Sequence, residues 1–202
     1  MTKFENKKFK YDKSDFKYIE INGVKTKVYR IISKINIATK RGMIVEGEFG
    51  GYCALGSLSE EGTCWVDKYS VVGPGCFVSG NAQIEKSLLA RDCTVGDRVI
   101  IKCSKIIPQN KVSIINDSRV ENCNVKGDLN LKDSSSLLKT KVFGTLKMEG
   151  GATLFGCDVK AEGRGIVMLG NQAYANITIS GQGTCAISEN IKFRKENLEK
   201  EI

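Results

Sequence analysis

Between residues 62 and 90, an aliphatic or small residue returns at every sixth position. The members of this series are Val66, Val72, Val78, Ile84 and Ala90. A small residue often stands two positions earlier, as at Cys64, Ser70, Cys76 and Ala82. An α-helix would bring an apolar residue back every three or four positions and a strand every second one, so neither element explains the period. The pattern indicates a short supersecondary unit repeated along the chain.

The same register continues well beyond residue 90. Further members stand at Val95, Ile101, Ile107, Ile114, Val120, Val125, Leu131 and Leu137, and then at Val142, Met148, Leu154 and Val159. A short strand and a sharp corner use about six residues, so three such units close a triangular coil of about 18 residues. Because strand side chains alternate between faces, the aliphatic residue and the small residue two before it both point inward. The pattern predicts an all-β solenoid rather than a β-sandwich, whose strands recur every 8 to about 12 residues.

The chain before the repeat follows a different pattern. Residues 17–32 alternate apolar and polar positions around Asn22-Gly23, which is a strong hairpin signal. We therefore expect a small β-hairpin module ahead of the solenoid. The expected division is a basic N-terminal arm at 1–17, the β-module at 18–48, the solenoid at 49–192 and a C-terminal cap at 193–202.

The last ten residues are helix-prone. We expect a short capping helix at 193–202 that places Leu198 and Ile202 over the open last coil. Solenoids need such a cover, because an exposed terminal coil would otherwise template aggregation.

The repeat also resembles that of hexapeptide-repeat β-helices, in which an aliphatic residue, a turn and a small residue recur. Their coils are left-handed, and the resemblance alone implies this hand here. A second resemblance covers residues 18 to 90, through the segment VEGEFGGYCALGSLSEEGTCWV at 45–66 and the repeat unit SGNAQI. It is to a family of short solenoid proteins common in phages and prophages. The matching entry-motif residues are Gly50, Gly51, Tyr52, Leu58, Ser59, Gly62, Trp65 and Val66. The resemblance implies a phage or mobile-element origin and a binding or structural role.

The eight cysteines follow the repeat as well. Seven of them stand two positions before an aliphatic residue, as Cys64 does before Val66 and Cys76 before Val78. Cys53 does the same before Leu55. A free thiol behaves as a small hydrophobic group, and the chain has no Cys-x-x-Cys spacing typical of zinc or redox sites. We therefore expect structural, reduced thiols, no metal site and a reducing compartment.

The chain contains no histidine. The familiar enzymes built on hexapeptide solenoids are acyltransferases, which use histidine as a general base, and carbonic anhydrases, which bind zinc through histidines. Histidine is the side chain best suited to proton transfer near neutral pH, so its absence argues against both classes. We expect a protein that is not an enzyme and that has no catalytic residues and no cofactor.

Charge gives the main pointer to a partner. The formal net charge is +8, and residues 1–41 hold twelve Lys or Arg against four Asp or Glu. Basic surfaces attract nucleic acid or acidic partners, although a lysine-rich terminus is also compatible with simple solvation. The candidate binding residues are Lys7, Lys8, Lys10, Lys13, Arg91, Arg98, Lys102, Lys105 and Arg119. The aromatic candidates for stacking on bases are Phe4, Phe9, Tyr11, Phe16, Tyr69 and Phe77.

Three functional hypotheses follow. The first is a non-enzymatic solenoid from a phage or mobile element that binds a host protein or nucleoprotein complex through its surface and basic arm. Inhibition of a bacterial defence complex, such as an RNA-guided nuclease, is the example we favour, with nucleic acid as a candidate contact. The second is a structural virion component or self-assembling scaffold, with homo-oligomers formed through solenoid faces. The third is a phage protein that binds or cleaves carbohydrate. No apolar run is long enough to span a membrane, and no signal peptide is apparent, so we expect the host cytoplasm.

Overall fold

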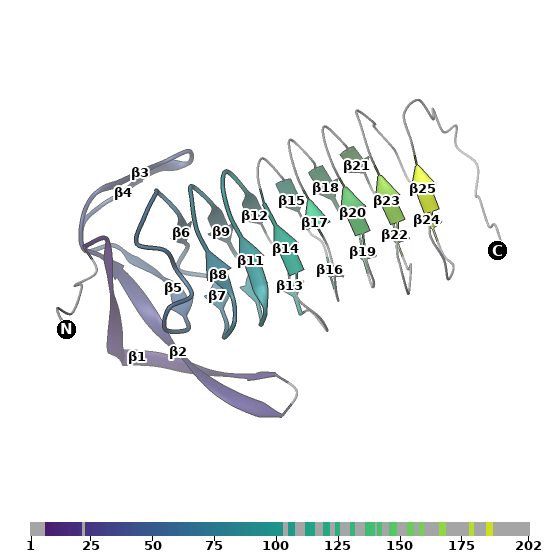
Figure 1. The fold of residues 1–202 in the computed structure, drawn as a ribbon. Coiled ribbons are helices and arrows are strands. Elements are labelled where there is room, and N and C mark those ends of the chain that lie inside the picture. Colours follow the sequence, from purple (N-terminus) through teal and green to yellow (C-terminus); the bar gives the residue numbers. More distant parts are fainter. Residues whose placement is uncertain are drawn as a thin grey trace, which may run out of the picture.

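Every regular element in the described part of the chain is a β-strand (Figure 1). The structure is a computed structural model that describes residues 7–21, 23–102, 105–107 and 112–115. Beyond these it describes Lys139 and the backbone of the strands up to residue 187. Residues 1–6 of the expected arm and the expected capping helix at 193–202 lie outside the described residues.

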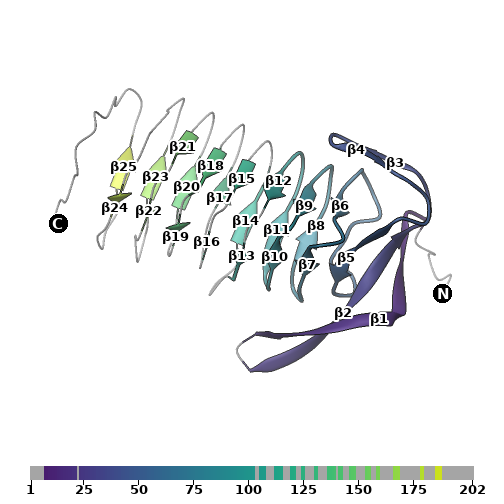
Figure 2. The ribbon, with the colours of Figure 1, turned by 180° about the vertical axis from the view of Figure 1, so that it is seen from behind.

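The strands form three stacked columns, which Figures 1 and 2 show from opposite sides. The first column contains β5 (Phe49–Cys53), β7 (Val71–Val72), β10 (Leu88–Leu89), β13 (Lys105–Ile106), β16 (Asn124–Val125), β19 (Lys141–Val142), β22 (Asp158–Val159) and β24 (Thr178–Ile179). The second contains β8 (Phe77–Val78), β11 (Cys93–Val95), β14 (Val112–Ile114), β17 (Asn130–Leu131), β20 (Leu146–Met148), β23 (Ile166–Met168) and β25 (Cys185–Ile187). The third contains β6 (Trp65–Val66), β9 (Gln83–Glu85), β12 (Ile100–Lys102), β15 (Arg119–Glu121), β18 (Ser136–Leu138) and β21 (Thr153–Phe155).

Successive strands pass from column to column, and each pairs in parallel with the strand three places later along most of the stack. This arrangement is a β-solenoid, as the sequence predicts. Two further strands extend the first column in antiparallel fashion: β2 (Val24–Ser33) pairs with β5, and β1 (Phe9–Ile21) pairs with β2. A separate small hairpin is made by β3 (Ile37–Thr39) and β4 (Gly42–Ile44).

The predicted aliphatic ladders run along the interior. Val66 pairs with Ile84, and Ile84 pairs with Ile101. Val78 pairs with Val95 in the same way. All five side chains are at most 1 % exposed. One aliphatic residue per strand therefore faces its counterpart in the next coil, and together they build a continuous core.

Two predicted ladder positions are wrong by one residue. In the first column, Val72 pairs with Leu89 and Leu89 with Ile106, each 17 residues further on. The sequence register had selected Ala90 and Ile107 instead. Ala90 is buried beside the ladder, whereas Ile107 is 36 % exposed. At Ala90 the shift arises at the short corner after Ile84, where the left-handed backbone of Lys86 (φ 46°) allows the chain to turn with one residue fewer. At Ile107 it arises at the corner after Ile101, because Val95 and Ile101 hold their predicted positions.

The prediction of buried, free thiols holds for the four cysteines whose side chains are described. Cys53, Cys64, Cys76 and Cys93 are free thiols and are buried. One detail is corrected, because Cys53 itself occupies the ladder position opposite Val72, while Leu55 is 60 % exposed. The side chains of the other four, at positions 103, 123, 157 and 185, lie outside the described part.

The N-terminal end of the solenoid is covered by the chain that precedes it. Phe9 and Ile31 from the β1–β2 ribbon are almost fully buried in the same core as Trp65, and Ile37 and Ile44 from the β3–β4 hairpin pack there as well. Gly50 makes this contact close, because a Cβ on it would lie 2.5 Å from Ile31 Cγ1. The sequence predicted a cap only for the opposite end.

Candidate functional site

The β1–β2 ribbon is the part of the molecule that departs from the solenoid. It starts at the N-terminal end and runs along one side of the coils (Figures 1 and 2). Its strands pair from Phe9 with Ser33 to Ile21 with Val24, and Gly23 occupies the turn with φ 78°. The predicted hairpin around Asn22-Gly23 is therefore confirmed in register, and the strand already begins within the segment expected as an arm.

One face of the ribbon packs on the outside of the first solenoid column. Val28 is fully buried in a cluster with Tyr52 and Ala54, and Ile19 and Val71 pack against it. This small apolar contact fixes which face of the ribbon is left to solvent.

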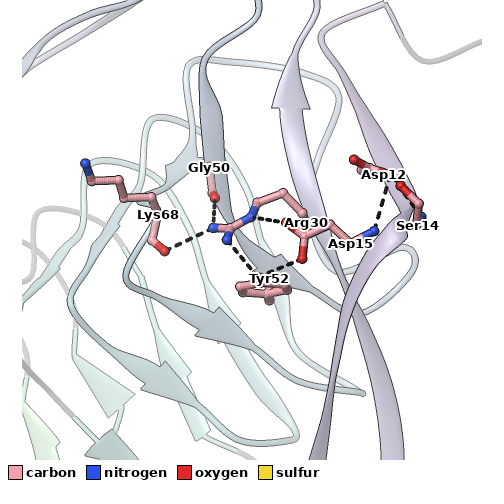
Figure 3. A network of polar contacts seen from close by, with 7 residues as sticks. All are labelled: Asp12, Ser14, Asp15, Arg30, Gly50, Tyr52 and Lys68. Carbon is pink, nitrogen blue, oxygen red and sulfur yellow. Dashed lines mark hydrogen bonds and ion pairs between the residues drawn. The ribbon is translucent and has the colours of Figure 1, made fainter.

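A hydrogen-bond network also joins the ribbon to the solenoid, and Arg30 lies at its centre (Figure 3). Its Nε donates to Asp15 Oδ2 at 3.0 Å, and its Nη2 donates to the Tyr52 hydroxyl at 2.7 Å. Its Nη1 donates to the carbonyl oxygens of Gly50 at 3.0 Å and Lys68 at 3.2 Å. The Tyr52 hydroxyl in turn donates to Asp15 Oδ1 at 2.8 Å. One guanidinium thus ties β1, β2, β5 and a solenoid corner together, which suits the planar fork of arginine.

The network shifts the pKa of its acidic members. Hydrogen bonds from Arg30 and then Tyr52 hold the pKa of Asp15 below its ordinary value. The pKa of Asp12 is lowered too, mainly because the Ser14 hydroxyl and backbone N–H donate to its carboxylate. Asp12 lies where the β1–β2 register shifts before Phe16. Both carboxylates are therefore held in the charged form at the bend of the ribbon.

The opposite face of the ribbon is exposed and carries aromatic rings interleaved with lysines. Phe16 lies opposite Tyr29, and Tyr18 lies opposite Lys27, so these four side chains share one face. Phe16 is 40 % and Tyr18 62 % exposed. Lys27 Nζ lies 3.7 Å from the Phe16 ring centroid and 5.8 Å from those of Tyr18 and Tyr29. With Lys25, one alternation further along β2, they form what we call the aromatic–lysine face.

Lys8 does not belong to an exposed binding surface. Its side chain is buried, with the residue only 4 % exposed. Its Nζ donates to the carbonyl oxygens of Ser59 at 3.0 Å and Glu61 at 3.3 Å, and lies 3.1 Å from Cys64 Sγ. The sequence predicts Lys8 as one of the basic binding residues, but its ammonium group anchors the N-terminal cover to the first coil instead.

The predicted solenoid residues whose side chains are described lie at different corners and columns. Lys102 ends β12 in the third column, Lys105 begins β13 in the first column, and Arg98 lies at the corner before β12. Arg91 pairs with its neighbour Asp92 at 2.8 Å. Arg119 begins β15, but its side chain lies outside the described residues. A triangular coil turns consecutive segments toward different directions, so a basic series in sequence is spread over several faces.

The remaining predicted residues, Lys7, Lys10 and Lys13, are exposed at or near the start of the ribbon. Two of the aromatic stacking candidates are wrong, because Phe9 is buried in the core and Tyr11 packs against it. Sequence reasoning passed over Tyr18, Lys25 and Lys27 as site residues. Their signal was present as the alternation within the hairpin, but the face turned to solvent could only be identified once the other face was seen to pack on the solenoid.

Within the described residues, no group of three or more Cys, Asp or Glu side chains is placed to hold a metal ion. The same part of the chain contains no helix that is long and apolar enough to cross a membrane. Compared with known proteins, the chain matches no family model and no curated protein sequence.

Proposed function

We propose that the protein is a non-enzymatic binding protein that holds an anionic macromolecular partner on the aromatic–lysine face of its ribbon. The observation that carries the proposal is the exposure of Phe16 and Tyr18 next to Lys27 on a face that the solenoid does not cover. Isolated exposed apolar side chains are ordinary, but clustered exposed rings are typical of interaction sites. Rings combined with cations are typical of sites that bind nucleic acid.

Charge and rigidity both support this proposal. Residues 7–33 hold eight Lys or Arg against three Asp or Glu, which favours encounter with a polyanion or an acidic protein. The Arg30 network fixes the ribbon to the solenoid. A face held in place before binding loses less conformational entropy when the partner arrives.

The kind of partner that we favour is a host protein or nucleoprotein complex in the cytoplasm. The resemblance of the entry motif to phage and prophage solenoids supports a mobile-element origin, and a basic binding face fits the obstruction of a nucleic-acid channel. We propose inhibition of a bacterial defence complex, for example an RNA-guided nuclease, as the biological role.

The finer points of the fold belong to the same proposal. We propose a left-handed hexapeptide-repeat solenoid closed by a helix at 193–202. The ladder steps of 17 residues between Val72, Leu89 and Ile106 support a coil of three near-hexapeptide units. Circular dichroism and limited proteolysis of a chain ending at residue 192 would test the cap, since loss of the helix should expose the last coil and promote aggregation.

The test of function is capture of partners from a bacterial lysate by three matched proteins. These are the wild type, a Phe16→Ser/Tyr18→Ser variant and a Tyr69→Ser control. Tyr69 is 65 % exposed on a solenoid corner and lies beside Lys68. The control therefore also removes an exposed ring beside a lysine, but at a site away from the aromatic–lysine face. We expect specific partners to be lost only with the ribbon variant. Equal capture by all three would contradict the proposal.

A self-assembling structural protein is the second candidate. One observation favours it, because β1 is the terminal strand of the ten-stranded sheet and one of its edges pairs with no described strand. Such an edge can pair with a second copy. Sedimentation that shows a monomer at micromolar concentration would count against this candidate. No observation within the described residues favours the carbohydrate alternative.

A further inference from the structure

We propose that the aromatic–lysine face binds single-stranded nucleic acid, with bases stacked on Phe16 and Tyr18 and phosphates held by Lys25 and Lys27. This inference rests on the function proposed above and narrows its partner to one chemical class. The structural basis is the juxtaposition of exposed rings and ammonium groups on one face of a fixed ribbon.

The two rings are spaced for an extended strand. Phe16 and Tyr18 occupy alternate positions of β1, which places them about 6.8 Å apart along the strand. Their centroids lie 5.7 Å apart with the ring planes at 86°. Adjacent bases in a duplex strand are stacked only 3.4 Å apart, so two bases can meet these rings only after they separate. A single strand does this readily and a duplex does not.

Lys27 now occupies the place of one base. Its Nζ lies 3.7 Å from the Phe16 centroid, a contact that at an exposed site favours the bound state by about two- to fivefold. Stacking of a base on an aromatic side chain is worth about 5- to 150-fold. The base therefore displaces the ammonium group, which then becomes available to a phosphate. In the absence of nucleic acid, Lys27 covers the Phe16 ring and shields it from solvent.

The charge of the face limits how far the strand's contacts extend. Lys25 is the last cation on this face before the tip and lies opposite Glu20, whose carboxylate disfavours phosphates beyond Lys25. Toward the base of the ribbon, the charged carboxylates of Asp12 and Asp15 come before the exposed Lys10 and Lys13. We therefore expect the strand to lie across the aromatic rings, between the bend and the tip of the ribbon.

The experiment measures fluorescence anisotropy of labelled 12-nucleotide oligothymidine and oligouridine, at about 50 mM salt and above, with full-length protein. A duplex of the same length and a labelled polyglutamate peptide are the comparison ligands. We expect the single strands to bind more tightly than the duplex or the peptide. Tyr18→Ala should weaken single-strand binding by about 5- to 150-fold, and Lys25→Gln should reduce the salt slope by about 0.7. Tyr69→Ala is the matched control and should leave affinity unchanged.

Thermal melting of each variant first establishes that the fold is retained, which we expect because Tyr18 is 62 % exposed. The inference is overturned if Tyr18→Ala weakens binding no more than Tyr69→Ala, or if the duplex or polyglutamate binds as tightly as the single strands. Failure with oligonucleotides but continued loss of lysate partners in the ribbon variant would overturn this inference and leave the proposed function standing. Failure in both assays would overturn both.

Discussion

The guanidinium carbon of Arg30 lies 4.0 Å from the centroid of the Tyr52 ring, and Nη2 of the same guanidinium donates a hydrogen bond of 2.7 Å to the Tyr52 hydroxyl. Lys17 Nζ is also 4.2 Å from that ring centroid. The junction between ribbon and solenoid thus combines a cation–π contact with directional hydrogen bonds. It explains how a long two-stranded ribbon, which would be only marginally stable alone, is held in one position.

Replacement of Arg30 should loosen this junction. In Arg30→Lys the charge is kept but the planar fork is lost, so the carbonyl oxygens of Gly50 and Lys68 lose their donor. We expect the free energy of unfolding to fall by about 1–3 kcal/mol, measured by urea denaturation. Arg41→Lys is the control, because Arg41 pairs with Glu85 at the surface and should cost less than about 1 kcal/mol. Equal losses in the two variants would contradict the assigned role of Arg30.

Acid should weaken the same junction. The pKa of Asp15 is lower in the folded protein than its ordinary value of 3.8, because Arg30 and Tyr52 donate to the carboxylate. Its stabilising contribution is therefore complete above pH 3.8 and is lost as the pH falls through the lower, folded-state value. We expect protease cleavage within the ribbon to increase in that range.

The variant Asp15→Asn tests whether the Asp15 carboxylate, rather than another one, causes the response to acid. Its ribbon should be more susceptible to protease at neutral pH and should show a smaller increase in cleavage on acidification. An acid response identical to that of the wild type would show that a different carboxylate is responsible. Asp12, which Ser14 holds in the charged form, is the next candidate to test in that case.

Gly73 should tolerate no side chain. A Cβ there would lie 1.8 Å from the backbone oxygen of Ala90 in the next coil and 2.9 Å from Ile19 Cδ1 of the ribbon. We expect Gly73→Ala to lower the free energy of unfolding by about 1–3 kcal/mol or more, because backbone has to move. Gly96→Ala is the control, since its nearest neighbour would be Ser79 Oγ at 3.3 Å, and thermal melting compares the two. Similar melting temperatures would contradict the close approach.

The thiols of Cys53 and Cys64 should be inert in the native protein. Burial raises the pKa of both Cys53 and Cys64, so the reactive thiolate is scarce and alkylating reagents cannot reach it. We expect iodoacetamide at pH 8 to leave both residues unmodified until urea unfolds the chain, as measured by peptide mass spectrometry. Rapid modification of Cys64 in the native state would show that the N-terminal cover opens.

The sequence was informative where one periodicity determines the structure. The six-residue return identified Val66, Val78 and Ile84 as core positions, and Asn22-Gly23 located the hairpin. It failed where adjacent residues were equally apolar. In the run from Leu88 to Ala90, more than one residue is apolar enough to point inward. The length of the preceding corner determines that Leu89 takes the ladder position.

Contacts between segments distant in the chain could not be predicted from the sequence, for a different reason. Lys8 is charged, which favours exposure, yet acceptors more than 50 positions away surround its ammonium group. Arg30 and Tyr52 likewise meet only because β2 and β5 pair. The aromatic–lysine face was predictable as an alternation along the hairpin. Its exposure could not be predicted, because it depends on Val28 on the other face packing against Tyr52 and Ala54.

The ladders keep their alignment although the coils differ in length. Val78 and Val95 are partners 17 residues apart, whereas Val95 and its next partner Ile114 are 19 apart. The extra residues fall between Ile106 and Ile114, and pairing resumes beyond them. Each coil advances the stack by one inter-strand spacing of about 4.8 Å regardless of what its corners carry. The solenoid therefore behaves as a molecular ruler, whose divisions are fixed by the core while its corners remain open to evolutionary insertion.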